Sequence, residues 1–420
     1  MDAKTLYTKL LDLRGPWHVV RVEVNERGRQ VDVWVEHEPG VEVACPECGR
    51  FGPVYDHTAE RAYRHLDSCD MATYVHVRLP RVQCERHGVR QILSEFGENG
   101  SAMTYAFERR MIAMLEECSL SGVQRLSGIT WDQAWAVVER AVTRGQERKE
   151  HRLPTRLGVD EKSFAKGHKY ETLVYDIDNG TVEYVADHRE QESLEGYFKA
   201  FTSEERGAVE AVAMDMWEPY INATLACIPN AKRKIVFDRF HIMGHVSKAV
   251  DEVRKREHHQ LMQAGHEDLK HTKYLWLWNE ENIPEWRRDE FEQLKAQDLK
   301  VCRAWAMKEN LRHLWSYRSE AWARKFFKKW YRWVVHSKLP AMIKAARTLR
   351  MHLDNIVTYA RLRITNALGE SLNSRIEKVK RMACGFRNRE HYKKAIYFHC
   401  GGLDLLPKPP STSRLRFAPC

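Results

Sequence analysis

Two aspartates follow short apolar segments in the middle of this 420-residue sequence. Asp160 lies in LGVDEKSF, and Asp215 lies in AVAMDMW. We expect one strand that ends at Asp160 and a second, buried strand that delivers Asp215. Carboxylates at the carboxyl ends of neighbouring strands lie where sheets of this kind bind ligands. Mg²⁺ prefers oxygen ligands and is usually held by a few carboxylates together with substrate phosphates, so the pair suits metal-dependent phosphoryl transfer.

A third acid is expected from a helix near the C-terminus, in TNALGESLNSRIEKVKRMACGFRN (365–388). Its apolar residues recur at helical spacing: Leu368, Leu372, Ile376 and Val379. A second face carries two asparagines and two glutamates: Asn366, Glu370, Asn373 and Glu377. Glu370 is the best candidate because an asparagine lies one turn away on either side. The alternative is an ordinary solvated face with pairing between residues four apart.

The next strand offers a rival third ligand. KRKIVFDRFH is expected to be a strand that ends at Asp238 and His241. Asp238 can therefore replace Glu370 in the acid set, which we expect to hold Mg²⁺ or Mn²⁺. Other aspartates nearby, such as Asp176, Asp178 and Asp187, are interpreted as turn or cap residues.

A second set of residues suits zinc. Cys45-Pro-Glu-Cys48 and Cys84-Glu-Arg-His87 are two ligand pairs separated by a β-rich stretch. This arrangement is typical of a zinc ribbon, in which thiolates and imidazole close a tetrahedral structural site. The CxxH pair is the weaker signal. Cys69 is the rival ligand, although it lacks a partner at the same spacing, and unrelated cysteines with a surface histidine are the remaining alternative.

Positive charge is concentrated in two windows. Residues 321–350 hold nine Lys or Arg and no acid, and residues 361–400 are net +7, whereas the whole chain is net +10. Such local charge indicates a surface that faces a polyanion, and no lipidation motif favours a membrane instead. A lysine-rich solvated helix face is the alternative. The residues expected to contact DNA are Lys325, Lys328, Lys329, Arg375, Lys378, Lys380 and Arg381.

The length and composition of the chain limit the classes of protein to which it can belong. A chain of 420 residues is expected to form two to four domains, and 43% hydrophobic residues indicate a packed globular protein. No run of eighteen apolar residues is present, so no transmembrane helix is expected. Ten cysteines without a secretory signal favour a reducing cytosol and metal ligation over a disulfide framework.

The helices and strands that must position these residues are expected to form an α+β, multidomain protein. A β-rich region, with a turn at Asn25–Gly28, precedes a helical pair in which Thr130 and Gln133 form a capping box. The pair has the pattern of a helix-turn-helix, although a plain helical hairpin is nearly as consistent. Asn179-Gly180 then predicts a hairpin. Three antiparallel strands followed by alternating helix and strand predict a sheet that is extended in parallel on one side.

The predicted domains follow the order of these motifs along the chain. They are a zinc-ribbon-like β region (1–98), a helix-turn-helix (99–150), the first part of a catalytic core (151–250), a helical insertion (251–360), the last catalytic helices (361–405) and a loose tail (406–420).

Taken together, these motifs resemble a DDE transposase of a bacterial insertion sequence, most similar to the ISL-three family. The likeness covers nearly the whole chain, and its most specific part is the segment from Glu370 through Asn373 and Lys380 to Gly385-Phe386. The resemblance implies a ribonuclease-H-like catalytic domain that is interrupted by the all-helical insertion.

The resemblance also implies the residue roles. Asp160, Asp215 and Glu370 take the positions of the family's catalytic triad. Asp238 and His241 match a DxxH feature near the site but outside the triad. One departure is that the second zinc pair usually reads CxxC, whereas here it ends in His87, so the fourth ligand differs from the family's pattern.

The expected function is therefore metal-dependent cleavage and joining of DNA. We expect the chain to bind the terminal inverted repeats of its element through residues 1–150, as a homodimer or higher oligomer in a bacterial cytoplasm at the nucleoid. Residue chemistry alone indicates only metal-dependent phosphoryl transfer on nucleic acid. The alternatives are a zinc-dependent DNA-binding regulator with an inactive nuclease-like domain, and a nuclease without strand transfer.

Overall fold

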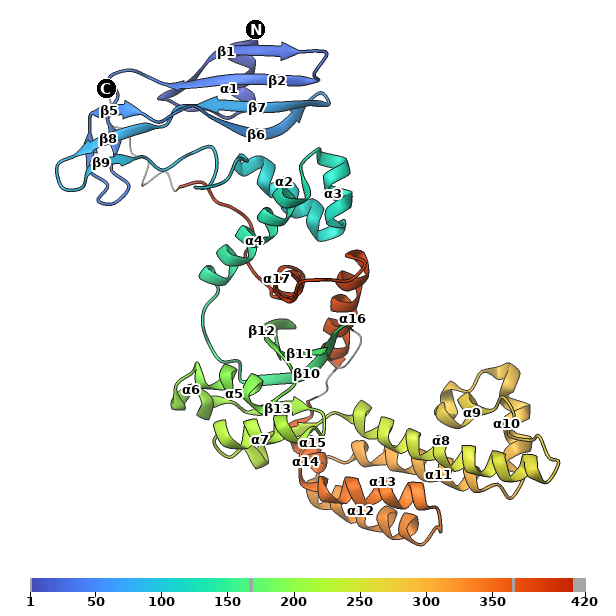
Figure 1. Ribbon diagram of the computed structural model, residues 1–420. Coiled ribbons are helices and arrows are strands. Elements are labelled where there is room, and N and C mark those ends of the chain that lie inside the picture. The colour runs from blue at the N-terminus through green and yellow to red at the C-terminus, as the bar shows by residue number, and fades with distance from the viewer. Residues whose placement is uncertain (1, 166–168, 365–366, 411–420) are drawn as a thin grey trace. The chain divides into compact units, whose positions relative to one another are not determined.

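The computed structural model describes residues 2–165, 169–364 and 367–410 (Figure 1). This part of the chain divides into two compact units. The first contains residues 2–149 with the short segments 382–384 and 403–410, and the second contains residues 150–381 and 385–402. The protein is α+β: the first unit contains three sheets and the second contains one, and each unit has its own helices.

The first unit begins with helix α1 (Ala3–Leu10) and a four-stranded sheet in the order β1-β2-β7-β6. Its strands are β1 (Trp17–Asn25), β2 (Gln30–His37), β6 (Arg61–Ser68) and β7 (Met71–Val77). The predicted turn at Asn25–Gly28 is confirmed, because Asn25 pairs with Gln30 and its side chain accepts the Gly28 amide at 2.8 Å. Valines on alternating positions of β2 are buried, as expected for a sheet with one face in a core.

Two small sheets carry the predicted zinc ligands. One pairs β3 (Val43–Ala44) with β4 (Phe51–Gly52), and the other has the order β5-β8-β9. The strands of the second sheet are β5 (Val54–His57), β8 (Pro80–Cys84) and β9 (Gly88–Gln91). Each ligand pair therefore occupies a tight turn between two short antiparallel strands.

Three helices complete the first unit: α2 (Tyr105–Glu117), α3 (Leu120–Ser127) and α4 (Trp131–Arg148). Helix α3 ends at Gly128, whose φ of 72° suits glycine, and α4 starts two residues later at the predicted Thr130–Gln133 capping box. Glu108 of α2 is buried and accepts hydrogen bonds from Arg140 and Arg144 of α4 at 2.7 and 2.6 Å. This paired charge fixes α2 against α4, because a buried carboxylate without partners would be costly.

The second unit is built on a five-stranded sheet in the order β12-β11-β10-β13-β14. The strands are β10 (Arg156–Ala165), β11 (Lys169–Asp176), β12 (Thr181–Asp187), β13 (Ala211–Met214) and β14 (Ile235–Phe237). The first three are antiparallel, and β13 and β14 extend the sheet in parallel from β10. This order confirms the predicted sheet, and the pairing of Asp176 with Thr181 confirms the hairpin at Asn179-Gly180.

Two predicted strand ends are wrong. Strand β10 does not end at Asp160 but continues to Ala165, because its antiparallel partner β11 pairs with it beyond that residue. Strand β14 ends at Phe237 and not at His241. Asp238 instead caps the N-terminus of helix α8 (Arg239–Gln263), with its Oδ1 accepting the Phe240 amide at 3.2 Å.

Helices cover both faces of this sheet (Figure 1). Helices α5 (Gln191–Lys199) and α7 (Glu218–Cys227) pack on the face that holds Leu157 and Val159. Helices α16 (Ala367–Met382) and α17 (Arg389–Cys400) pack on the opposite face, which holds Leu173 and Tyr175. Successive residues of a strand face opposite sides, so Asp160 and Glu161 point to different helix layers. A short helix, α6 (Ser203–Ala208), precedes β13.

Between β14 and α16 the chain is helical. After α8 come α9 (Lys273–Leu277), α10 (Arg288–Lys295), α11 (Lys300–Leu311), α12 (Glu320–Val335), α13 (Pro340–Met351), α14 (Leu353–Val357) and α15 (Tyr359–Leu362). Trp276, Trp305 and Trp330 are buried among these helices, so much of the tryptophan content of the chain serves this core.

The predicted helical face of α16 is present. Leu372, Ile376 and Val379 are buried, and Glu370 is exposed. The side chain of Leu368 and residue Asn366, which the sequence analysis placed on the two faces of this helix, lie outside what the structure describes.

Candidate active site and zinc centre

Strand register brings three aspartates to one edge of the sheet. Gly158 lies opposite Ala213 in the parallel pairing of β10 with β13, so Asp160 and Asp215, each two residues further on, are level. Met214 lies opposite Phe237, so Asp215 and Asp238 are level in turn. Ala213 and the Gly158–Tyr175 pair belong to the face covered by α16, so the alternation of side chains along a strand directs Asp160 and Asp215 to that same face.

Helix α16 closes on this edge through Asn373. Its Nδ2 donates to Oδ2 of Asp160 at 2.6 Å, and the other carboxylate oxygen accepts the Glu161 amide at 2.7 Å. Lys162 and Lys380 strengthen the contact by donating to backbone carbonyls of Asn373 (3.3 Å) and Ser163 (2.8 Å). Asn373 therefore orients Asp160 directly, and a helix distant in sequence is fixed beside the strand.

Asp215 is paired with a histidine from the first turn of α8. His241 Nδ1 lies 3.2 Å from Oδ2 of Asp215, and its Nε2 lies 3.8 Å from Oδ2 of Asp238. The hydrogen bond and negative charge of Asp215 raise the pKa of His241 to about 9 against the opposing effect of burial. Burial alone would raise the pKa of Asp215, but the hydrogen bond and charge of His241 bring it below its usual value. The pair is thus a charged imidazolium and a carboxylate at neutral pH.

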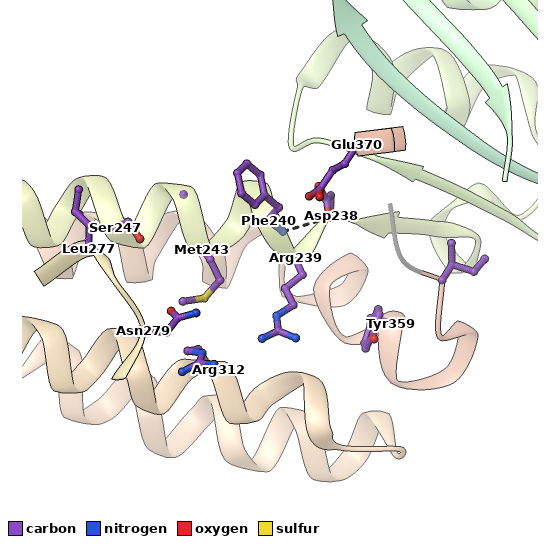
Figure 2. Close-up of a pocket in the computed structure, with 12 residues that line it drawn as sticks. Asp238, Arg239, Phe240, Met243, Ser247, Leu277, Asn279, Arg312, Tyr359 and Glu370 are labelled. Atoms are coloured by element: carbon purple, nitrogen blue, oxygen red, sulfur yellow. Dashed lines mark hydrogen bonds between the residues drawn. The ribbon is translucent and has the colours of Figure 1, made fainter. Parts of the chain in front are cut away.

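Glu370 lies in the first turn of α16 and is exposed. Figure 2 shows its carboxylate beside Asp238, where both residues line one end of a cleft. The buried ring of Tyr175 is influenced both by Asp160 and by the pair Asp238 and Glu370. Burial first, and then the negative charges of Asp160, Asp238 and Glu370, raise the pKa of Tyr175 well above its usual range. One phenol therefore lies within the electrostatic reach of three acids.

Glu377, the other glutamate of this helical face, has different neighbours. One of its oxygens lies 3.4 Å from Lys162 Nζ, and the other lies 3.7 Å from Arg381 Nε. Its charge is balanced by these bases, whereas Glu370 has its side chain in the cleft. The two glutamates of this face therefore differ in environment, and the choice of Glu370 as the catalytic acid stays a prediction.

The donor set suits a hard divalent cation. Carboxylates of Asp160, Asp215 and Glu370 are oxygen donors of the type that Mg²⁺ prefers, although among the described residues they do not form a set of ligand atoms that all lie within 4.8 Å of one another. Asp215 and Asp238 have similar contacts, since one oxygen of each accepts a backbone amide and the other lies near His241, so these contacts do not separate Asp238 from the proposed set.

Two pairs of residues around Asp160 were not predicted from the sequence, Gly158 with Tyr175 and Glu161 with Arg189. A Cβ on Gly158 would lie 2.0 Å from the ring of Tyr175, so the glycine makes room for the phenol under the acids. On the opposite face, Glu161 pairs with Arg189 at 3.0 Å, and burial raises the pKa of this glutamate. A glycine inside an apolar strand was the available signal for a close approach, but its partner depends on strand register.

The basic residues that were expected to contact DNA occupy different environments. Lys325, Lys328 and Lys329 are exposed on α12. Arg375 is exposed but donates to the His399 carbonyl at 2.6 Å, and Lys380 is half-buried in its contact with β10. Lys378 and Arg381 are exposed on α16. Among the α16 bases, Lys380, Arg375 and Arg381 therefore have contacts within the protein.

The predicted zinc ligands converge in the first unit. One ligand atom each from Cys45, Cys48, Cys84 and His87 lies within 4.8 Å of all the others. Cys48 Sγ is 3.7 Å from Cys84 Sγ, and His87 Nδ1 is 3.6 Å from Cys45 Sγ and 3.7 Å from Cys84 Sγ. A tetrahedron with Zn–S bonds of about 2.3 Å has edges of roughly 3.8 Å, so the set fits zinc.

The surroundings of the cluster favour the thiolate form of Cys84, whereas the pKa of Cys48 is raised. Backbone amides of His87 and Arg86 lower the pKa of Cys84 to about 6. The second ring nitrogen of His87 lies 3.7 Å from Oε2 of Glu47, the type of outer contact that orients a metal-bound imidazole. Cys69 is exposed at the turn between β6 and β7 and is not among the four clustered ligands. Glu47 is a further residue that sequence analysis missed, although it lies inside the first knuckle.

Within the residues that the structure describes, no helix is both long enough and apolar enough to cross a membrane.

Comparison with known proteins yields matches over both units. Residues 157–396 match the family model of the ISL3-type DDE transposase, described as "Transposase". Residues 42–87 match a model described as the zinc-finger of transposase IS204/IS1001/IS1096/IS1165. This second match, together with the Cys₃His cluster, indicates a structural zinc site.

Curated relatives match over most of their length. The chain is 25% identical over 393 residues to the transposase for insertion sequence element IS1001 of Bordetella parapertussis, covering 91% of this chain and 96% of the relative. It is also 25% identical over 387 residues to the transposase for insertion sequence element IS1557 of Mycobacterium tuberculosis, covering 86% of each chain. Because the family model spans more than half of the sequence, this chain belongs to the ISL3 family of insertion-sequence transposases.

Proposed function

We propose that this transposase binds the terminal inverted repeats of its element and carries out metal-dependent cleavage and strand transfer, with Asp160, Asp215 and Glu370 as the catalytic acids. The observation that carries the proposal is the arrangement of acids at one end of the sheet, where strand register makes Asp160 level with Asp215 and Glu370 of α16 lies beside Asp238. A divalent ion held there, Mg²⁺ or Mn²⁺, would activate the attacking oxygen and stabilise the leaving oxygen.

The side chains around the acids have supporting roles in this proposal. Asn373 holds Asp160 in one orientation, and His241 offsets part of the negative charge at Asp215 and Asp238. In cleavage, water attacks the phosphodiester at the element end, and the bond to the 3′ oxygen breaks. In transfer, that freed 3′ hydroxyl attacks a phosphodiester of target DNA, and the number of phosphodiester bonds is conserved.

The domain assignments are part of the proposal. The strand order β12-β11-β10-β13-β14, with three antiparallel strands and two parallel ones, supports a ribonuclease-H-like core. Helices α8 to α15 then form an insertion between its fifth strand and α16. The short turn between α3 and α4, with Trp131, Asp132 and Gln133 exposed at the start of α4, supports a helix-turn-helix that reads DNA. An element has two ends, so we expect two or more copies of the chain on DNA.

One experiment separates this function from its alternatives. End-labelled element DNA is incubated with the protein and Mg²⁺, with and without a target plasmid. A transposase cuts at the end and joins it to the target, a nuclease only cuts, and a regulator only binds. Binding without any cutting in Mg²⁺ or Mn²⁺ would refute the catalytic assignment, since the acid cluster would then be inactive.

A further inference from the structure

The cleft beside Glu370 extends away from the acids into the helical insertion. Its volume is about 540 Å³, and its lining comes from α8, from the segment around Leu277 and Asn279, from Arg312 and from Tyr359. Asp238 and Glu370 lie at one end, as Figure 2 shows. Of the three proposed catalytic acids only Glu370 lines this cleft, so most of its space is available to another part of the substrate.

Phe240 is a highly exposed aromatic residue in the lining of the cleft. Its side chain is 67% exposed, although it is a large aromatic residue two positions from Asp238. Its backbone amide donates to the Asp238 cap, which fixes the backbone at this position beside Asp238, and its ring lies edge-on to that of His241 with centroids 6.0 Å apart. Met243 and Tyr359 add apolar surface nearby. An exposed ring held beside a reaction centre is a platform on which a planar group can stack.

The two arginines of the cleft differ in their charge balance. Arg312 donates to Glu281 at 2.8 Å and to Glu309 at 2.6 Å, so its charge is neutralised within the insertion. No carboxylate pairs with Arg239 in the part of the chain that the structure describes, and its guanidinium carbon lies 5.3 Å from the centroid of the Trp315 ring. Arg239 is therefore a cation available to a phosphate that enters the cleft.

These features together match one ligand class. A nucleotide has a flat apolar base, polar base edges and an anionic phosphate. Phe240 offers a surface for the base, Ser247 and Asn279 offer hydrogen bonds to its edge, and Arg239 offers a positive charge. A base inside a duplex cannot stack on a protein ring, because its own neighbours cover both faces. The nucleotide must therefore be unpaired.

We propose that this cleft binds one unpaired nucleotide of the element end, extruded next to the scissile phosphate, with its base stacked on Phe240 and a flanking phosphate on Arg239. The inference rests on the proposed function, because it takes DNA as the substrate of the neighbouring acids. Its role is to hold the scissile phosphate at the acids by anchoring the adjacent nucleotide.

The first test uses fluorescence. The base analogue 2-aminopurine is placed in turn at each position within a few nucleotides of the cleavage site in an element-end duplex, and full-length protein is added with Ca²⁺ to hold back cleavage. We expect one position to brighten severalfold on binding. If wild-type protein cleaves the same duplex in Mg²⁺ but no position brightens, the proposal is overturned. If it cleaves no end DNA, the proposed function itself fails.

The second test uses rescue. Phe240→Ala should slow cleavage of the paired duplex about tenfold or more, in line with the cost of losing one base–aromatic stack. A duplex with a mismatch at the brightened position should restore the variant to within about threefold of wild type, because less energy is then needed to extrude the base. Phe240→Trp should retain activity on both duplexes.

The control is Trp286→Ala, which removes another aromatic residue of the insertion that is 81% exposed and does not line the cleft. This control should behave as wild type on both duplexes. Arg239→Gln should weaken activity on paired and mismatched DNA alike, because phosphate binding does not depend on pairing. Equal losses of Phe240→Ala on paired and mismatched duplexes would mean that the ring has only a structural role, and the proposal would be wrong.

Discussion

The zinc centre and the acid cluster are two ligand sets of opposite character. In the zinc centre, four ligands from two tight turns fill a tetrahedron and leave no open position. In the acid cluster, the carboxylates come from two strands and a distant helix, and Glu370 faces a cleft. Zinc can stabilise a fold because its ligands enclose it, whereas a metal that acts on DNA needs coordination sites open to the substrate.

The outer contacts of the two sites show the same contrast. Around zinc, Glu47 touches the ligand His87 and in turn accepts from Arg90 at 2.6 Å, on a surface of the first unit. Around the acids, His241 adds a positive charge that lowers the repulsion between Asp215 and Asp238. The acid cluster is thus stabilised by neighbouring groups before any metal binds, and removal of one acid should leave the fold intact.

The largest expected effect comes from the acids. Asp160→Asn or Asp215→Asn should reduce end cleavage by roughly a thousandfold or more, since metal stabilisation is worth several kcal/mol and each 1.36 kcal/mol is a factor of ten. Binding of element ends should be unchanged, because amides keep the shape of the carboxylates. Cleavage in Mg²⁺ and gel-shift binding of the same preparations test both statements. Cleavage at the wild-type rate by either variant would remove that residue from the active site.

Glu370 and Glu377 provide an internal comparison on one helix. Glu370→Gln should lose both end cutting and strand transfer, by about a hundredfold or more, because its carboxylate faces the cleft. Glu377→Gln should keep most activity, because its neighbours are Lys162 and Arg381. Turnover is measured in Mg²⁺ and Mn²⁺, with folding checked by circular dichroism. An inactive Glu377→Gln beside an active Glu370→Gln would make Glu377 the metal ligand instead.

More of the zinc centre than of the acid site could be predicted from the sequence. The zinc ligands could be predicted because knuckle spacing is local, and Cys45 to Cys48 specifies a tight turn without reference to other elements. Asp215 was found in the same way, at the end of a short buried strand. The strand through Asp160 was predicted too short, since its length depends on pairing with β11. Tyr175 could not be found, because only strand register places it beside Gly158.

Loss of zinc should affect the first unit and leave the acids in place. Cys45→Ser or Cys84→Ser should reduce bound zinc from one ion per chain to near zero. Zinc supplies roughly 10–16 kcal/mol of binding free energy in small zinc domains, so the ribbon should unfold and end binding should weaken. Elemental analysis, with protein made without chelator, measures the metal. Zinc retained by His87→Ala but absent from Cys69→Ser would overturn the ligand set.

Substitution of Glu47, which contacts the zinc ligand His87, is a milder test of the zinc centre. Glu47→Gln keeps all four ligands but weakens the contact that orients His87. We expect zinc affinity to fall about 10-fold to 100-fold, as is usual for such partners, with the metal still bound at stoichiometric concentration. Competition with a chromophoric chelator measures the affinity. An unchanged affinity would show that the 3.7 Å contact has no role in zinc binding.

The smallest expected effect concerns how DNA reaches the open site. Lys325, Lys328 and Lys329 are exposed on α12, and replacing all three with Gln should weaken binding to every DNA sequence alike. The slope of log affinity against log salt should flatten by up to about one unit for each phosphate that is no longer neutralised. Lys199→Gln is the matched control, because that lysine already pairs with Glu195. If the triple variant and the control share the wild-type slope, α12 is an ordinary solvated face. DNA affinity would then come from other surfaces, and the acid site would rely on them to deliver its substrate.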